Sequence, residues 1–346
     1  MTAPHFVMNC SGTVLSSLAN TVLRAYEDSG ATPASVARDV LGGDASILEQ
    51  SESRLPFGAY AKMWDLCGEA SGDPEFGARA ASRSMEAGTF GVVGFLARSA
   101  PTLRGALECV VRHGALLNET SRTLLFLEGD TAVIRDGPAD PSARWPAHKA
   151  EFVMAAYVLL TFEWAGLGRR PVSVSFQHSR RPNLGYLQSI FGAEVTFGAP
   201  FNDLRFPAAW LDRALPSAEA DLYAFLERQA SEQTSKLDGE RDLLAEIRRV
   251  VVNALPQGGA PSLEQVARTL GTGHRTLQRR LQSHDTSYRD LVDELRFQRC
   301  RTLLVDDELT IDSVSSMLGF SEARAFRRAV RRWSGLSPRG LRQRLV

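Results

Sequence analysis

The feature that most constrains the fold of this chain is a pattern that occurs twice in its last third, 48 residues apart. The first copy, SLEQVARTLGTGHRTLQRRL, begins at Ser262, and the second, TIDSVSSMLGFSEARAFRRAV, begins at Thr310. In each copy, positions spaced i, i+3, i+4 and i+7 carry small or apolar side chains, which predicts a short amphipathic helix. These positions are Leu263, Val266, Ala267 and Leu270 in the first copy, and Ile311, Val314, Ser315 and Leu318 in the second.

The residues that flank these short helices favour a sharp turn after each of them. Gly271 follows the first helix and Gly319 the second, where left-handed backbone commonly ends a helix. Ser262 and Gln265 form a capping-box pattern at the first start, and Thr310 can cap the second. The chain is therefore expected to turn and to begin another helix in both copies.

The second helix of each copy is predicted to carry a basic face opposite an apolar one. In the later copy the arginines are Arg324, Arg327, Arg328 and Arg331, and the apolar stripe is Phe326, Ala329, Val330 and Trp333. In the earlier copy Arg275, Gln278, Arg279 and Gln282 lie opposite Leu277 and Leu281. One basic stripe alone is also typical of a solvated surface. Two copies of helix, tight turn and basic helix indicate tandem helix-turn-helix units, whose second helices enter the DNA major groove.

The charge of the chain is balanced in total but not along its length. Lysines and arginines together number 40, as do aspartates and glutamates. From Ser262 to the end there are 16 arginines and 10 acidic residues, so the preceding part carries the compensating negative charge. Such a split is typical of a basic nucleic-acid-binding module joined to an acidic one.

These motifs resemble the DNA-binding domain of AraC/XylS-type bacterial transcription regulators. The resemblance covers residues 260–346 and rests on VARTLGTGHRTLQRRL, LRFQRCRTLL and VSSMLGFSEARAFRRAVRRWSGLSPRGLR. It implies two helical subdomains joined by a central helix, each with one recognition helix. Leu281 and Leu341 stand where aromatic residues are common in the family, and both replacements keep the position apolar.

The resemblance also implies which residues face the groove. They are His274, Arg275, Gln278 and Arg279 in the first unit, and Glu322, Ala323, Arg324, Arg327 and Arg328 in the second. Arg275 and Arg324 project from the first turn of their helices, so we expect them to read base edges. Arg279 and Arg328 are open between base and phosphate contacts. Three further arginines, Arg331, Arg332 and Arg339, are expected either to contact phosphates or to remain solvated.

Residues 1–230 show different patterns. The first 118 residues alternate amphipathic helical stretches with turns, although GTFGVVGF at 88–95 is expected to form a tight loop. RTLLFLEGDTAVIRDG predicts a hairpin, and PVSVSFQH and EVTFGAPFNDLRFP predict further strands. AHKAEFVMAAYVLLTFEWAGLG predicts a long apolar helix, whose aromatic residues are expected in the core rather than around a ligand: Phe152, Tyr157, Phe162 and Trp164. The fold class is therefore mainly α, with an α+β N-terminal domain and an all-α C-terminal domain of tandem helix-turn-helix units.

The N-terminal part resembles the arabinose-binding-like domain of regulators of the ornithine-regulator type. The matching pieces are HGALLN, VSVSFQH and FGAEVTFGAPFNDLRF. The predicted strands are too few for the sugar-binding barrel of the arabinose regulator itself, so arabinose is not expected as a ligand. The resemblance implies a domain that binds an effector, dimerises, or does both.

Four polar residues are candidates for binding a small-molecule effector: His113, His178, Arg180 and Arg181. His178 ends a predicted strand and is followed by SRRP, whose arginines could hold a carboxylate. In the alternative interpretation, His178 is a strand-end histidine that hydrogen-bonds to the backbone.

The predicted organisation has three parts. Residues 1–230 form an effector-binding or dimerisation domain, and the polar stretch SEQTSKLDGERD at 231–242 forms a linker. Residues 243–346 form the DNA-binding domain, with helix-turn-helix units at 262–283 and 310–333.

Motifs for catalysis, metals and membranes are missing from the sequence. It contains no GxSxG, HExxH, P-loop or strand-linked GxGxxG motif, so neither an enzyme nor a cofactor is expected. The cysteines form no CxxC pair, which favours reduced thiols over a zinc site. There is no run of 18 apolar residues and no secretory signal pattern, so a cytoplasmic protein is expected.

The sequence thus predicts an effector-responsive transcription activator. It is expected to act as a homodimer on double-stranded promoter DNA, together with RNA polymerase. Two alternatives stay open: a constitutive regulator whose N-terminal domain only dimerises, and an enzyme fused to a DNA-binding module.

Overall fold

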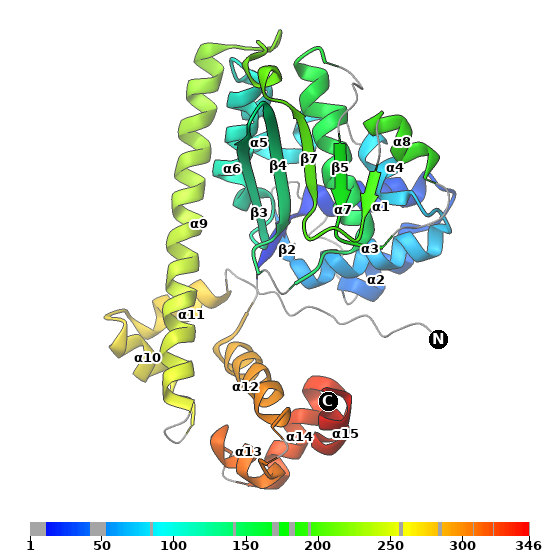
Figure 1. Ribbon diagram of the computed structural model, residues 1–346. Helices are drawn as coiled ribbons and strands as arrows, with labels where there is room; N and C mark the ends of the chain where they lie inside the picture. The colour runs from blue at the N-terminus through cyan, green and yellow to red at the C-terminus, as the bar shows by residue number, and fades with distance from the viewer. Residues whose placement is uncertain are drawn as a thin grey trace. The chain divides into compact units, whose positions relative to one another are not determined.

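The chain folds into two compact units, unit 1 (Met1–Ser235) and unit 2 (Lys236–Val346) (Figure 1). The first combines helices with a sheet and the second is helical, so the predicted fold class is confirmed. The computed structural model describes residues 12–41, 53–83, 86–140, 143–167, 173–179, 184–192, 195–255, 259–282, 286–306, 308–320 and 322–345.

Helices dominate the first part of unit 1. They are α1 (Ser16–Glu27), α2 (Pro33–Leu41), α3 (Phe57–Ser71), α4 (Phe76–Arg83), the 3-10 turn η2 (Ala87–Phe90), α5 (Gly91–Ser99) and α6 (Leu103–Leu117). The antiparallel strands β1 (Thr13–Leu15) and β2 (Arg54–Pro56) were not predicted. The expected loop at 88–95 is also wrong, because this stretch forms η2 and the start of α5. Val93, Leu96 and Ala97 are buried at helical spacing, and α5 packs on α6, so tertiary contacts favour the helix here.

A five-stranded sheet follows, with the strand order β3-β4-β7-β5-β6. β3 (Ser121–Glu128) and β4 (Thr131–Pro138) form the predicted antiparallel hairpin, and β7 (Asp203–Pro207) pairs antiparallel with β4 and with β5 (Ser173–Phe176). The helix α8 (Gly185–Phe191) connects β5 to its parallel neighbour β6 (Val195–Phe197). α6 packs on β3, and α7 (Ala147–Ala156) packs on β4 and β5, so these helices cover one face of the sheet.

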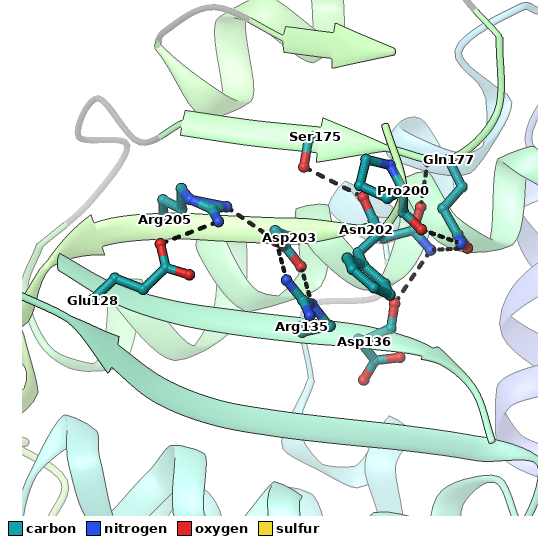
Figure 2. A network of polar contacts seen from close by, with 10 residues as sticks. Glu128, Arg135, Asp136, Ser175, Gln177, Pro200, Asn202, Asp203 and Arg205 are labelled. Atoms are coloured by element: carbon teal, nitrogen blue, oxygen red, sulfur yellow. Dashed lines mark hydrogen bonds and ion pairs between the residues drawn. The ribbon is translucent and has the colours of Figure 1, made fainter. Parts of the chain in front are cut away.

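The other face of the sheet carries a network of ion pairs (Figure 2). Arg135 on β4 donates two hydrogen bonds to Asp203, at 2.7 and 2.9 Å, and Arg205 pairs with both Asp203 and Glu128. Side chains alternate between the two faces of a strand, so Ile134 and Asp136 on β4 point the opposite way, towards the helices. Both of these residues are buried.

The predicted long apolar helix is present but changes its geometry part-way. α7 continues into the π-helical segment η3 (Tyr157–Phe162), which is wider than an α-helix. Phe152 and Phe162 are fully buried, as expected of core residues. The segment ends before Gly166, whose φ of 64° is readily adopted by glycine.

The expected polar linker at 231–242 is helical. The 3-10 turn η4 (Ala208–Asp212) precedes α9 (Ala220–Ala254), and α9 runs through the whole polar stretch. Residues such as Glu, Gln, Lys and Leu have high helix propensity, and no proline interrupts them. The division between the units, after Ser235, falls within this helix.

Unit 2 contains two hydrophobic cores along a central helix, α12 (Tyr288–Leu304). The N-terminal half of α12 packs with the end of α9, α10 (Leu263–Thr269) and α11 (His274–Gln282). Its C-terminal half packs with α13 (Ile311–Met317), α14 (Ala323–Ser334) and α15 (Pro338–Leu345). This arrangement agrees with the two subdomains and the joining helix that the family resemblance implies.

Candidate nucleic-acid interface

The first helix-turn-helix unit has the local geometry that its sequence predicts. The Ser262 hydroxyl accepts the Gln265 backbone N–H at 3.3 Å, and the Gln265 side chain accepts the Ser262 N–H at 2.7 Å. These bonds complete the capping box of α10. Gly271, with a φ of 62°, then turns the chain into α11, where Leu277 and Leu281 are buried.

The second helix-turn-helix unit repeats this geometry. The Thr310 hydroxyl accepts the Ser313 backbone N–H at 3.0 Å and caps α13. Gly319 has a φ of 74°, which a residue with a Cβ adopts only at a cost, and the chain then enters α14. α14 buries Phe326, Ala329 and Val330 in the second core, as the apolar stripe predicts. In both helix-turn-helix units the recognition helix therefore packs its apolar side into a hydrophobic core.

The residues expected in the groove lie on the free faces of these two helices, except Glu322, which is the N-cap of α14. The exposed ones are Arg275, Gln278, Arg279, Glu322, Arg324, Arg327, Arg328 and Arg331, and the half-buried ones are His274 and Ala323. Arg327 lies 4.0 Å from Asp312, and His274 lies 3.6 Å from Glu264. Exposed pairs of this length contribute little to stability, so they do not prevent these side chains from turning to another partner.

Two other arginines of unit 2 make contacts that join its helices. The Arg332 guanidinium lies 2.6 Å from Asp293, which connects α14 to α12. Arg342 donates to the backbone carbonyls of Leu304, at 3.0 Å, and Leu309, at 2.6 Å. Arg342 therefore satisfies a carbonyl at the C-terminal end of α12, where the helix leaves such groups without a partner.

A basic groove lies between α12 and α14 and was not predicted from the sequence. It has a volume of about 420 Å³, and its arginines are Arg289, Arg296, Arg328 and Arg332. The guanidinium of Arg296 lies over the Phe320 ring, 4.9 Å from its centroid, and burial lowers the pKa of Arg296. The sequence signal for this groove is the i, i+7 spacing of Arg289 and Arg296, which places both arginines on one side of the same helix. Such a groove suits an anionic group such as a DNA phosphate.

The effector candidate His113 lies on α6 and faces α9. Its side chain is buried, with Nδ1 2.9 Å from the Thr234 hydroxyl and Nε2 3.3 Å from a Glu227 oxygen. The same Glu227 oxygen pairs with Arg112, and the Cys109 sulfur lies 3.6 Å from the Tyr223 hydroxyl. His113 is thus part of a set of polar contacts that holds α9 against α6.

The effector candidate His178 follows β5. Its Nδ1 lies 3.0 Å from the Ser179 carbonyl, and its Nε2 lies 3.4 Å from a carboxylate oxygen of buried Glu151. The ring also packs against Phe176 and Phe197. Arg180 and Arg181 lie outside the described residues. His113 and His178 have no neighbour in common among these contacts, so the structure does not bring them into one site.

Two negative findings apply to the residues that the structure describes. They contain no group of three His, Cys, Asp or Glu side chains that could hold a metal ion. None of their helices is both long enough and apolar enough to cross a membrane.

Two capped helix-turn-helix units with basic recognition helices define a DNA-binding transcription regulator. Comparison with known families agrees with this class. Residues 30–215 match the family described as "Arabinose-binding domain of AraC transcription regulator, N-term", and residues 266–344 match the one described as "Helix-turn-helix domain". The chain belongs to this family of AraC-type transcription regulators.

Similar proteins are found along most of the chain. It is 26% identical over 297 residues to the ornithine utilization regulator of Pseudomonas aeruginosa, covering 86% of this chain and 87% of the relative. It is 27% identical over 304 residues to the HTH-type transcriptional regulator VirS of Mycobacterium tuberculosis, covering 86% of each. The crystal structure of the transcriptional regulator CdpR from Pseudomonas aeruginosa aligns with a TM-score of 0.41 at 22% identity, covering 89% of this chain and 98% of that one.

Proposed function

We propose that this regulator is an effector-responsive activator that reads promoter DNA with α11 and α14. The observation that carries the proposal is the repeated geometry of the two units. In each, a capped helix and a glycine turn precede a recognition helix whose apolar face is buried and whose basic face is exposed. Two such helices joined by α12 suit successive major-groove segments on one side of the DNA.

The roles of the exposed side chains follow from their positions and chemistry. Arg275 and Arg324 stand at equivalent first-turn positions, and we assign them to guanine edges, which a guanidinium group binds through two hydrogen bonds. Gln278 is equivalent to Arg327, so the first helix is suited to adenine where the second is suited to guanine. Arg328 lines the basic groove as well as the exposed face, which supports a phosphate contact.

The remaining groove-facing residues have supporting roles in this proposal. Arg279 contacts a base or a phosphate one turn after Arg275, and Arg331 contacts a phosphate near the end of α14. His274, Glu322 and Ala323 lie where the helices approach the DNA and shape the fit there.

The proposal includes a homodimer that recruits RNA polymerase in the bacterial cytoplasm. Leu222 and Phe225 are exposed apolar side chains on α9, and such side chains support a surface for self-association. Contact with RNA polymerase follows from the activator role, and the location follows from that of promoter DNA.

A constitutive regulator is the second candidate function. The contacts of His113 with α9 favour it, because a residue put forward for the effector has a structural role there. The relatives are transcription regulators, which points away from an enzyme.

The test uses the full-length protein and fragmented genomic DNA from its source. Bound fragments are recovered and sequenced, and transcription from an enriched promoter is then measured with purified bacterial RNA polymerase. We expect enrichment of promoter fragments, weakening as salt rises from about 50 to 200 mM, and more transcript when the protein is present. No enrichment at any salt concentration would overturn the DNA-binding role. Enrichment with reduced transcript would overturn the activator role.

A further inference from the structure

Unit 1 contains a partly open cavity of about 100 Å³ between its helices and the inner face of the sheet. Most of its wall is apolar and comes from α5, α6, α7 and η3, including Val93, Val110, Phe152 and Leu160. Phe152, Tyr157 and Trp164, which the sequence placed in the core, all line this cavity, whereas His113 and His178 do not. The π-helical segment contributes Tyr157, and such segments occur frequently at functional sites.

One end of the cavity is polar and is built by the hairpin. Thr123 on β3 and Asp136 on β4 are directly opposite each other in the strand register. The Oδ2 atom of Asp136 accepts the Thr123 hydroxyl at 2.5 Å and the Tyr157 hydroxyl at 3.2 Å. The backbone carbonyl of Asp136 accepts the Asn202 amide, and its carboxylate points away from that network (Figure 2). The carboxylate is therefore directed to the helical side of the sheet, where the cavity lies.

Two polar atoms on residues of the cavity wall lack hydrogen-bond partners. They are Oδ1 of Asp136, an acceptor, and Nδ2 of Asn118, a donor, on residues only 4% and 5% exposed. The other end of the Asn118 amide accepts the Thr120 backbone N–H at 3.0 Å, which establishes that the remaining atom is the nitrogen. Buried polar atoms are nearly always satisfied in native proteins, so this pair suggests a ligand with both a donor and an acceptor.

The charges in the wall are already balanced. Lys149 is buried beside the cavity with its ammonium group over the Trp145 ring. Burial raises the pKa of Asp136 to about 6, with the Lys149 charge opposing the rise. Burial likewise lowers the pKa of Lys149, with the Asp136 charge opposing the fall. A ligand with a net charge would add a third buried charge without a counter-ion, which is costly.

We propose that this cavity is the effector site, and that it takes a small uncharged molecule with an apolar body and a head group that both donates and accepts hydrogen bonds, such as a primary amide or an alcohol. An amide N–H can donate to Asp136 Oδ1, and an amide carbonyl can accept from Asn118 Nδ2. A carboxylate lacks the donor, and an ammonium group lacks the acceptor. The inference rests on the proposed effector response and names the chemistry of its ligand.

The size of the cavity limits the ligand further. A cavity of about 150 Å³ holds benzene, so about 100 Å³ has room for roughly four to six non-hydrogen atoms. Butyramide meets this limit and carries the required head group. Butyrate and n-butylammonium have similar size and shape but carry one negative and one positive charge, so they serve as matched controls.

The test measures binding of the three compounds to the full-length protein, without DNA, by isothermal titration calorimetry and thermal shift near pH 7.5. Butyramide is expected to bind about tenfold tighter, or more, than either charged compound. No binding of butyramide, or equally tight binding of a charged compound, would overturn the inference.

Two substitutions then locate the site. Gly114→Leu directs a larger side chain from α6 into the cavity, where a Cβ would first meet the Thr123 hydroxyl at 3.9 Å. It should weaken butyramide binding about tenfold or more, whereas Gly185→Leu, on α8 with no atom within 4 Å of a Cβ, should not. Asn118→Asp keeps the acceptor for Thr120, removes the free donor, and should weaken binding as well. Wild-type affinity in Gly114→Leu would overturn the assignment of the cavity.

The outcomes separate this inference from the proposed function. Protein that binds promoter DNA but not butyramide contradicts only the ligand inference. Protein that binds butyramide but no DNA contradicts only the DNA-binding role. If Gly114→Leu or Asn118→Asp fails to fold, the comparison of the three compounds on the wild-type protein still decides.

Discussion

Phe326 is a buried residue on which the orientation of the α14 arginines depends. Its side chain is fully buried in the second core of unit 2, and its ring centroid lies 5.5 Å from that of Phe320. Arg324 and Arg328 are on the same helix, two residues to either side, so they face outwards only while Phe326 faces inwards. We predict that Phe326→Ala loosens this part of unit 2 and abolishes DNA binding without removing any DNA contact.

The magnitude follows from burial, and Trp333 in the same core provides the comparison. Replacing a fully buried phenylalanine by alanine costs about 3–5 kcal/mol, from lost apolar contact and from the cavity left behind. Trp333 is only half-buried, and its indole N–H is buried without a hydrogen-bond partner. Trp333→Phe loses some apolar contact but also removes an unsatisfied N–H donor. A buried donor without a partner destabilises a protein by about 1–3 kcal/mol, so its removal offsets the lost contact. We therefore expect Trp333→Phe to change stability by less than about 1 kcal/mol.

Hydrogen exchange of the full-length protein, followed by mass spectrometry, measures both variants. Phe326→Ala should lower the protection of amides in α13 and α14 by about two to three and a half orders of magnitude, since each 1.4 kcal/mol is a factor of ten. Trp333→Phe should leave this protection close to wild type. Fluorescence anisotropy should then show loss of DNA binding only for Phe326→Ala. Wild-type protection and DNA affinity in Phe326→Ala would show that α14 is rotated differently, and the groove-facing arginines would have to be reassigned.

Three further predictions concern other parts of the molecule. Gly77→Ala should lower the free energy of unfolding in urea by about 1–3 kcal/mol, because a Cβ there would lie 2.0 Å from the His148 carbonyl. Gly58→Ala should not lower it, because no atom lies within 4 Å of a Cβ at that position. Equal stability of the two variants would contradict the close contact of α4 with α7. Arg332→Ala removes the ion pair with Asp293 and should weaken binding to two unrelated duplexes by the same factor, with a stability change below about 1 kcal/mol; an altered base preference in anisotropy titrations would argue against this role. At most one of the four cysteines should react with a thiol reagent at pH 8 before urea is added. Burial raises the pKa of the other three thiols, to about 12 in two cases, so they remain protonated and unreactive. A second reactive thiol in the folded protein would refute this prediction. The three buried thiols are those of Cys67, Cys109 and Cys300.

The DNA-binding unit could be predicted closely because its signals are local. Ser262 with Gln265, Thr310, Gly271 and Gly319 each act within a few residues of chain, and their caps and turns appear in the structure as predicted. The helical spacing of apolar residues likewise defined the buried faces of α11 and α14. What remained hidden was the basic groove, because its arginines come from two different helices.

The N-terminal unit was less predictable because tertiary contacts decide its details. The GTFGVVGF stretch contains glycines that favour a loop, but burial of Val93 and Leu96 makes it helical. The polar stretch at 231–242 lacks apolar periodicity, yet α9 continues through it. The cavity depends on Asn118, Asp136 and Lys149, which only the folded chain brings into one wall. No spacing in the sequence indicates that two of their polar atoms are left without partners.

The central claim is that α11 and α14 each read a separate group of base pairs. Selection from a randomised duplex library with the full-length protein tests it most directly. We expect a motif of two base clusters about 10 base pairs apart, one turn of DNA. Arg275→Ala should erase the preference in one cluster and Arg324→Ala in the other, each costing about 1–3 kcal/mol on the wild-type site. Arg228→Ala, which removes an exposed charge on α9 in unit 1, should leave both clusters unchanged. A selected motif that neither Arg275→Ala nor Arg324→Ala alters, or binding without any base preference, would contradict the claim.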